Sequence, residues 1–350
     1  MSDMAKSDIP QGSNAFYDHP ILNSPYECPT RHWELKDGLP TQRIKPVRRP
    51  ADFITPIPKP KKRRGKVEQA SLLTIQDLSS EQEYHKALIN QVRNHVAAWR
   101  ALPPSQWKVS PTTARLLQHW RHHAFSGIRP FFCQVEAVET AIWLTEVAPQ
   151  QKRYQEILEH LKQANDEANS GLPRLALKLA TGAGKTTVMA MLIAWQTLNA
   201  VRSPSTRSFT KGFLVVAPGI TIKDRLRVLQ PNDPDAYYAS RELVPQDMLQ
   251  DLQQARIVIT NYHAFKLREK LKVASGTRAA LEGWRGEQLD TQESEGEMLQ
   301  RVIPELMNLK RVMVINDEAH HCYREKPNAD AVLEEELSDL KGAEQTEARN

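Results

Sequence analysis

Short apolar stretches alternate with longer amphipathic segments through the second half of the chain. Four of these stretches, LALKLA, FLVVAP, RIVIT and RVMVIN, occupy residues 175–180, 213–218, 256–260 and 311–316. Each has the length and composition of a buried strand, and each is followed by a segment that is not strand-like. Alternating strands and helices are typical of a parallel sheet covered on both faces. The pattern therefore predicts an α/β fold whose ligands gather at the strand ends.

The segments between these strands have helical spacing. We expect helices over residues 133–146, 153–164 and 186–198, and a further helix that begins at Ile220. The helix over 186–198, TTVMAMLIAWQTL, is apolar nearly all round, which is typical of a buried helix. By contrast, residues 274–298 are mostly polar, and we interpret them as an insertion or a mobile loop.

A helical section precedes the α/β pattern and covers residues 69–125. Ser80 and Glu83 have the spacing of a capping box. Apolar residues then recur at helical spacing and predict a helix with one buried face: Tyr84, Leu88, Val92, Val96 and Trp99. PTTARLLQHWRHH, from Pro111, predicts a second helix. Its three histidines have no carboxylate or cysteine at a matching spacing, so we do not expect a metal site there.

Residues 1–68 are rich in proline and polar groups, and we expect an extended or disordered arm. Between residues 43 and 66 there are ten Lys and Arg against one acid, so this run has a formal charge of +9. The formal net charge of the whole chain is +5, so the other residues together carry −4. Two readings stay open for the run: a solvated tail, or contact with nucleic-acid phosphates.

Composition restricts the class of protein. With 350 residues, of which 40% are hydrophobic and 25% charged, the chain has room for one large domain and a smaller one. Cys28, Cys133 and Cys322 match neither a disulfide framework nor a metal motif, which favours a reducing compartment. No secretory segment or membrane span is apparent, so we expect a cytoplasmic protein without membrane contact.

The stretch LATGAGKTT, residues 179–187, follows the first predicted strand and precedes the buried helix. Gly182 and Gly184 would let the backbone turn tightly so that its N–H groups face a phosphate chain at the helix N-terminus. Lys185 is placed to reach the β- and γ-phosphates, and the Thr186 hydroxyl is placed to bind Mg²⁺. The general motif has glycine at the position of Leu179, so this loop departs from it.

An acidic motif, NDEAHH, ends the last predicted strand. Asp317 and Glu318 would therefore lie at the same edge of the sheet as the phosphate loop. Asp317 is expected to hold the Mg²⁺ shell, and Glu318 to orient and deprotonate the attacking water. His320 is a candidate for a hydrogen bond toward a second lobe or DNA-coupling elements. The two motifs in this order predict an ATP–Mg²⁺ site.

These residues resemble superfamily 2 DEAD/DEAH-type helicases and translocases. Ala180–Thr186 match motif I, which lacks the early glycine in that superfamily, and DEAH matches motif II. The resemblance implies a RecA-like P-loop domain over residues 126–350, with Gln134 at the position that reads the adenine edge. It also implies a set of ATP contacts: Gln134, Thr181, Gly182, Ala183, Gly184, Lys185, Thr186 and Thr187.

The same resemblance implies contacts with nucleic acid. VVAPGITIKDRL, from Val215, looks like motif Ia, and TNYHAF, residues 260–265, looks like the next motif that contacts DNA. Phosphate contact needs hydrogen-bond donors rather than base-reading groups. The candidates are Thr221, Lys223, Arg225, Thr260 and Asn261.

Within the superfamily the chain is most similar to the Res subunit of type III restriction enzymes. HPILNSPYECPTRHW, the PIPKPKKRR run and FFCQVEAVETAIWLTEVA carry this resemblance, so it covers nearly the whole chain. It implies DNA as a partner and a role in defence. It leaves open whether a modification methyltransferase subunit is also a partner. The family uses a second lobe, yet only 33 residues follow Asp317. We therefore expect an N-terminal fragment that hydrolyses ATP slowly or not at all by itself.

Other functions are alternatives to a DNA translocase of the Res type. An RNA helicase or a DNA-repair helicase would have the same motifs, and the nucleic acid that stimulates hydrolysis distinguishes them. A nucleotide-gated binding module would bind ATP without turnover. A small-molecule P-loop kinase is the weakest alternative, because DEAH and the upstream glutamine have no role in it.

Overall fold

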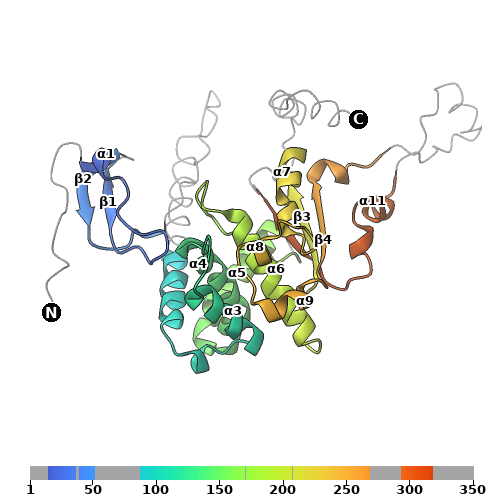
Figure 1. Ribbon diagram of the computed structural model, residues 1–350, viewed down its shortest axis with the longest axis horizontal. Coiled ribbons are helices and arrows are strands. Elements are labelled where there is room, and N and C mark those ends of the chain that lie inside the picture. The colour runs from blue at the N-terminus through green and yellow to red at the C-terminus, as the bar shows by residue number, and fades with distance from the viewer. Residues whose placement is uncertain are drawn as a thin grey trace, which may run out of the picture. The chain divides into compact units, whose positions relative to one another are not determined.

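The computed structural model describes residues 15–36, 39–51, 87–169, 171–206, 208–268 and 293–317. The chain divides into two compact units (Figure 1). The first unit comprises Met1–Arg121 with Arg129–Val188, and the second comprises His122–Ile128 with Met189–Asn350. No helix among the described residues is long and apolar enough to cross a membrane.

The second unit contains a parallel three-stranded sheet. Its strands are β3 (Gly212–Ala217), β4 (Arg256–Asn261) and β5 (Met313–Asn316), in the order β4-β3-β5. The central strand β3 is buried at every position. Three of the four strands predicted from the apolar stretches are therefore confirmed, as is the α/β class.

Both faces of β3 are covered. On one face Leu214 and Val216 pack with Leu306, against partly buried residues that include Ile303 and Phe265. Alternate strand residues point to opposite faces, and Phe213 and Val215, on the other face, are both fully buried. The first face is covered by Leu306 of η8 (Pro304–Leu306) and by Ile303, the residue between α11 (Glu295–Val302) and η8.

The predicted strand LALKLA is wrong. Residues 172–180 have no regular secondary structure. The side chains of Leu172 and Leu175 are 52% and 47% exposed. A strand requires a neighbouring backbone to complete its hydrogen bonds, and within the described residues this segment has no strand partner. The apolar pattern by itself does not supply that partner.

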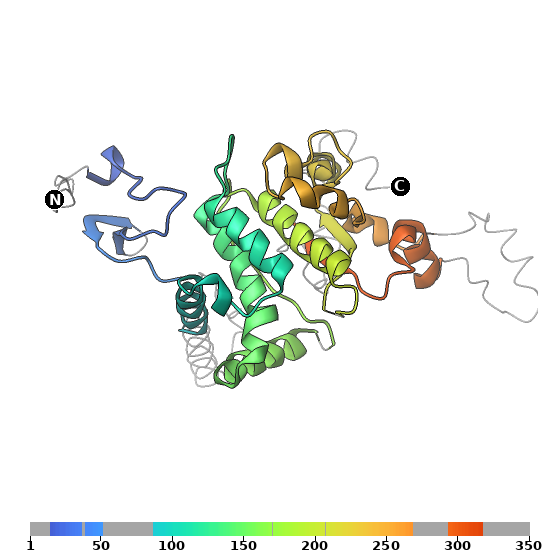
Figure 2. The same ribbon diagram turned by 60° about the horizontal axis from the view of Figure 1, so that its bottom comes forward.

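Helix α6 (Lys185–Arg202) follows this segment and is the long yellow-green helix of Figure 2. Its side chains are buried around the whole circumference, as predicted, since Met191, Ile193, Ala194 and Leu198 are all fully inaccessible. Shorter helices connect β3 to β4 or follow β4: α7 (Ile220–Arg225), η5 (Leu226–Leu229), α8 (Tyr237–Ser240), η6 (Gln246–Met248), α9 (Leu249–Leu252) and η7 (Tyr262–Phe265).

The polar segment expected as a loop over 274–298 is partly helical. Ser294 caps α11, because its hydroxyl accepts a hydrogen bond from the Glu297 amide at 3.3 Å while the Glu297 carboxylate accepts one from the Ser294 amide at 2.9 Å. This reciprocal pair is a capping box, which stabilises a helix start even in a polar sequence. Residues 274–292 lie outside the described part of the chain.

The first unit contains the predicted helical section. A helix over residues 87–100 buries Val92, Val96 and Trp99. Ser80, Glu83 and Tyr84 lie outside the described residues. The further helices are η1 (Pro104–Gln106), α3 (Pro111–His122), α4 (Phe132–Ile142), the π-helical turn η2 (Trp143–Val147), η3 (Ala148–Gln150), η4 (Lys152–Tyr154) and α5 (Gln155–Asn169). The helices predicted near 133–146 and 153–164 are confirmed.

The disordered arm predicted for residues 1–68 is wrong in part. A short helix α1 (Ala15–Asp18) precedes an antiparallel pair formed by β1 (His32–Lys36) and β2 (Leu39–Lys45). Trp33 is 7% exposed, and its ring contacts that of Phe16 with centroids 5.7 Å apart. These aromatic side chains form a small core. The prediction missed it because it rested on the overall proline-rich composition of residues 1–68, in which a few aromatic residues carry little weight. Residues 1–14 and 52–86 are outside the described ranges.

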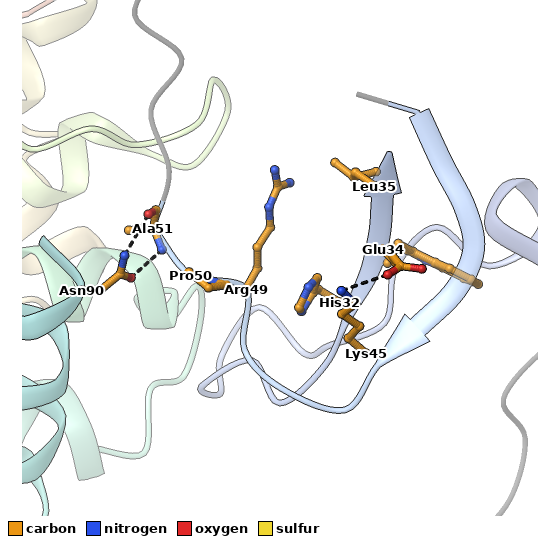
Figure 3. A pocket seen from close by; sticks show the side chains of 9 residues that line it. His32, Glu34, Leu35, Lys45, Arg49, Pro50, Ala51 and Asn90 are labelled. Carbon is orange, nitrogen blue, oxygen red and sulfur yellow. Dashed lines mark hydrogen bonds and ion pairs between the residues drawn. The ribbon is translucent and has the colours of Figure 1, made fainter. Parts of the chain in front are cut away.

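Hydrogen bonds from residues 48–51 connect the β1–β2 pair to the helices of the first unit. Both Nη atoms of Arg48 donate to the Glu136 carboxylate of α4, at 2.8 and 2.5 Å. The Asn90 side chain bonds the backbone of Ala51 twice, at 2.7 and 3.0 Å (Figure 3). Arg48 belongs to the basic run, so at least this one of its charges has a structural partner within the protein.

Candidate functional site: a phosphate loop and a strand edge

The phosphate loop lies in the first unit and leads directly into α6. Gly182 and Gly184 adopt φ angles of +79° and +76°, which side-chain-bearing residues rarely adopt. The Ala183 amide donates to Ala180 O at 3.1 Å, which closes the turn, and α6 begins at Lys185. A tight glycine turn at a helix N-terminus directs backbone N–H groups toward an anion. The predicted turn is therefore present.

Gln134 on α4 is bonded to this loop. Its Nε2 donates to Ala183 O at 2.8 Å and approaches Gly184 O at 3.4 Å, while its Oε1 accepts from the Phe131 amide at 2.8 Å. The side chain is 4% exposed. The resemblance implied that this amide reads adenine, and the structure places both of its ends on protein backbone. That adenine contact stays a prediction.

The same contact explains why position 184 is glycine. A Cβ added to Gly184 would lie 2.3 Å from the Gln134 Nε2 atom, closer than any real contact. The corresponding test at Gly182 finds no atom within 4 Å, so only its positive φ requires glycine there. The sequence motif contains both glycines but gives no signal that one of them makes room for a side chain 50 residues upstream.

The remaining loop residues differ in exposure. Lys185 and Thr186, the first two residues of α6, are partly exposed, and Thr181 is exposed. Thr187 is only 2% exposed and its amide donates to Gly184 O at 3.0 Å. Among the predicted loop residues 181–187, Thr187 is therefore the buried one, as Gln134 is among the predicted contacts outside the loop.

The carboxyl edge of the sheet lies in the second unit and contains the other predicted groups. Asn316 and Thr260 both pair with Val216 of the central strand, and Asn261 pairs with Ala217. The Asp317 amide donates to Val216 O at 2.9 Å, which continues the ladder beyond β5. Parallel pairing therefore brings these polar residues to one edge. The sequence predicted that Asp317 shares this edge with the phosphate loop, and that stays a prediction. Glu318 and His320 lie outside the described residues.

The predicted nucleic-acid contacts are distributed along this edge. Lys223 and Arg225 are exposed on α7, which follows β3, and Thr221 belongs to the same helix. Asn261 also has a local role, because its Oδ1 accepts from the Ala264 amide at 3.0 Å and caps η7. Capping uses its oxygen, so any phosphate contact would use the donor side of the amide.

A buried ionic network on α4 was not found from the sequence. Glu139 is inaccessible, and its two carboxylate oxygens accept from Arg100 Nε at 2.6 Å and Arg121 Nε at 2.7 Å. Burial raises the pKa of Glu136, but hydrogen bonds and charge from Arg48, with Arg100, outweigh it and hold the pKa below the ordinary 4.5. The network fixes the helix that presents Gln134.

A shallow pocket of about 330 Å³ lies between the β1–β2 pair and residues 49–51 (Figure 3). Lys45 and Arg49 line it, but Lys45 pairs with Glu34 at 2.9 Å, which cancels one charge. Neither glycine turn nor helix start faces this pocket. It therefore does not compete with the phosphate loop as a nucleotide site.

A glycine turn that opens a helix, and a parallel α/β sheet with an acidic residue after its last strand, define a RecA-like P-loop domain. The sequence model of the type III restriction enzyme Res subunit matches residues 144–340, which is more than half of the chain. The chain belongs to this family, and its domain is an ATP-dependent, helicase-like domain of the Res type. No curated protein and no solved structure matches the chain.

Proposed function

We propose that this domain binds ATP–Mg²⁺ through residues 180–187 and couples its hydrolysis to movement along DNA. Lys185 would contact the β- and γ-phosphates. The Thr186 hydroxyl and the Asp317 carboxylate would hold Mg²⁺, which prefers oxygen ligands of these two kinds and would neutralise phosphate charge. Glu318 would orient the attacking water and accept its proton.

The observation that carries the proposal is the start of α6. Two glycines in the left-handed region place the N-terminus of an 18-residue helix directly behind the loop, with Lys185 as its first residue. The helix dipole favours an anion at this point. The Gln134 contact supports it further, because its amide hydrogen bonds occupy the Ala183 and Gly184 carbonyl oxygens, which would otherwise repel an anion.

The sheet edge supports the second half of the proposal. Thr221, Lys223 and Arg225 follow β3, and Thr260 and Asn261 end β4. These residues supply hydroxyl, amide and cationic donors, which suit a phosphate backbone and carry no base code. Nucleic acid bound across the strand ends would lie over the same edge as Asp317.

ATP hydrolysis with and without duplex DNA tests the proposal. We expect Lys185→Ala to abolish ATP binding, because it removes the cation at the phosphates. Glu318→Gln should keep binding and lose turnover, because an amide cannot accept the water proton. If Glu318→Gln changes neither turnover nor any DNA-dependent activity, the chain is a binding module and not an ATPase.

The nucleic acid is tested in the same assay. We propose DNA as the partner because the family is that of a restriction subunit, and duplex RNA provides the comparison. Stimulation by RNA and not by DNA would reassign the domain to an RNA helicase. The proposed setting is cytoplasmic defence with a modification methyltransferase subunit, and failure of such a subunit to co-purify would argue against that setting.

A further inference from the structure

Arg301 on α11 holds the segment that follows β4. Its Nη1 donates to Ala264 O at 3.1 Å and its Nη2 to Lys266 O at 3.2 Å. The same guanidinium makes a two-point contact with Glu293, from Nε at 2.8 Å and from Nη2 at 2.8 Å. One planar side chain therefore ties two carbonyls of this segment to an acid beside α11.

Glu293 in turn fixes the far end of the segment. Its amide donates to Arg268 O at 2.9 Å, and its carboxylate accepts from the Arg268 amide at 3.2 Å. The near end is fixed by the Asn261 cap on Ala264. The Arg301 and Glu293 side chains are 27% and 11% exposed, so their pair is better shielded than an ordinary surface ion pair.

The segment held in this way is cationic. Residues 260–268, TNYHAFKLR, contain one lysine and one arginine and no acid. Lys266 and Arg268 are both exposed. The backbone carbonyl of Lys266 points to the Arg301 guanidinium, and the segment begins at Thr260 and Asn261 on the strand edge proposed to contact nucleic acid.

Fixing this segment before binding has an energetic consequence. An unrestrained loop loses conformational entropy when it is ordered by a ligand, at about 1–2 kcal/mol for each residue whose backbone is fixed. A segment restrained at both ends avoids much of that loss. Only arginine can make the two-point contact with a carboxylate and bond two carbonyls, so lysine is a poor substitute at position 301.

We infer that Lys266 contacts a phosphate of the nucleic-acid backbone, and that Arg301 and Glu293 are positioning residues that hold it at the strand edge. The inference rests on the proposed nucleic-acid function and adds a cationic contact beyond the edge residues already named. Arg301 and Glu293 act through the segment and do not themselves touch the ligand.

The experiment measures affinity of the whole chain for a short labelled DNA duplex over a series of salt concentrations. Lys266→Ala should weaken binding on the order of three- to tenfold and lower the salt slope by about one, as expected for one lost phosphate contact. Arg301→Gln should weaken binding at least as much. Arg301→Lys should not restore it, because the charge remains and the geometry does not.

A matched control separates positioning from general destabilisation. Arg202 pairs with Asp251 at 2.7 Å in the same unit, with side chains 30% and 32% exposed, away from residues 260–268 in the sequence. Arg202→Gln should leave DNA affinity unchanged. ATP affinity should be unchanged in both Arg301 variants, since the phosphate loop is not part of this contact.

The outcomes are distinguishable. If the unaltered chain binds no duplex, the proposed nucleic-acid function fails and this inference fails with it. If the unaltered chain binds and Lys266→Ala binds equally, with an unchanged salt slope, only the phosphate contact is overturned. If Arg301→Lys restores full affinity, or if Arg301→Gln lowers ATP and DNA affinity together, the positioning role is overturned.

Discussion

The phosphate loop and the carboxyl strand edge contain the two halves of the proposed chemistry, but they are held by different forces. The edge is an extension of a buried ladder, in which Val216 pairs with Thr260 on one side and Asn316 on the other. The loop follows an exposed segment without regular structure and is held by one buried amide, Gln134, and by the start of α6. Apolar packing therefore positions the acid, whereas polar contacts position the phosphate cradle.

This difference predicts how each half responds to substitution. The strand edge should depend on core volume and tolerate changes of surface polarity. The loop should depend on a few atoms around Gly184 and be insensitive to distant core changes. The predictions that follow begin with the largest expected effect.

Phe213→Ala should be the most damaging change to the strand edge. Phe213 is fully buried in the central strand, so truncation leaves a cavity and should lower the free energy of unfolding by about 3–5 kcal/mol. Val314→Ala on β5 is the matched control, because Val314 is 51% exposed and should change stability by less than about 1 kcal/mol. Denaturant unfolding measures both. If both variants lose the same free energy of unfolding, Phe213 does not belong to the core of the sheet.

Gly184→Ala should have an intermediate effect, confined to the loop. The added Cβ would clash with the Gln134 Nε2 atom, and the alanine backbone would have to adopt a positive φ. Together these two effects should lower the free energy of unfolding by about 2 kcal/mol. In a Gln134→Ala background the first cost disappears and only the backbone strain remains. The substitutions should therefore be non-additive in a double-mutant cycle. Additive losses would contradict the Gln134 contact.

The acid dependence of the first unit should be the smallest effect. The pKa of Glu136 is held below 4.5 in the folded protein, through Arg48 and Arg100 acting against burial. A lowered pKa means that this stabilisation is fully present above pH 4.5 and is lost as the pH falls through the folded value. Thermal unfolding between pH 7 and pH 3 measures it. Glu136→Gln should flatten this part of the profile, and an unchanged profile would exclude the role.

The same contrast separates what the sequence predicted from what it did not. Strand β3 and helix α6 were predicted because apolar patterning reflects burial, and both are buried. Strands β4 and β5 were predicted from the same pattern, but Ile257 is the only buried residue in them, and they are held by backbone pairing with β3. The pairing of β3 with β4 and β5 brings Thr260, Asn261 and Asp317 to one edge, whereas the predicted position of the phosphate loop at the edge of Asp317 stays a prediction. LALKLA has the same pattern but has no strand partner in the described residues, so patterning alone was misleading.

Contacts between distant polar side chains could not be predicted. Gln134 with Ala183, Arg48 with Glu136, and Arg301 with Glu293 depend on tertiary placement and leave no periodic signal. The β1–β2 pair was missed for a related reason, since its small core rests on isolated aromatic residues within a proline-rich sequence. The sequence identifies the motif residues, whose roles stay predictions, and gives no signal for the residues that support them.

Direct titration of the chain with ATP–Mg²⁺ tests the central claim, that residues 180–187 form a nucleotide site opened by α6. The account predicts saturable binding that Lys185→Ala abolishes, while Lys178→Ala, at an exposed lysine seven residues earlier, retains it. Binding that survives Lys185→Ala unchanged, or that is lost equally in both variants, would contradict it.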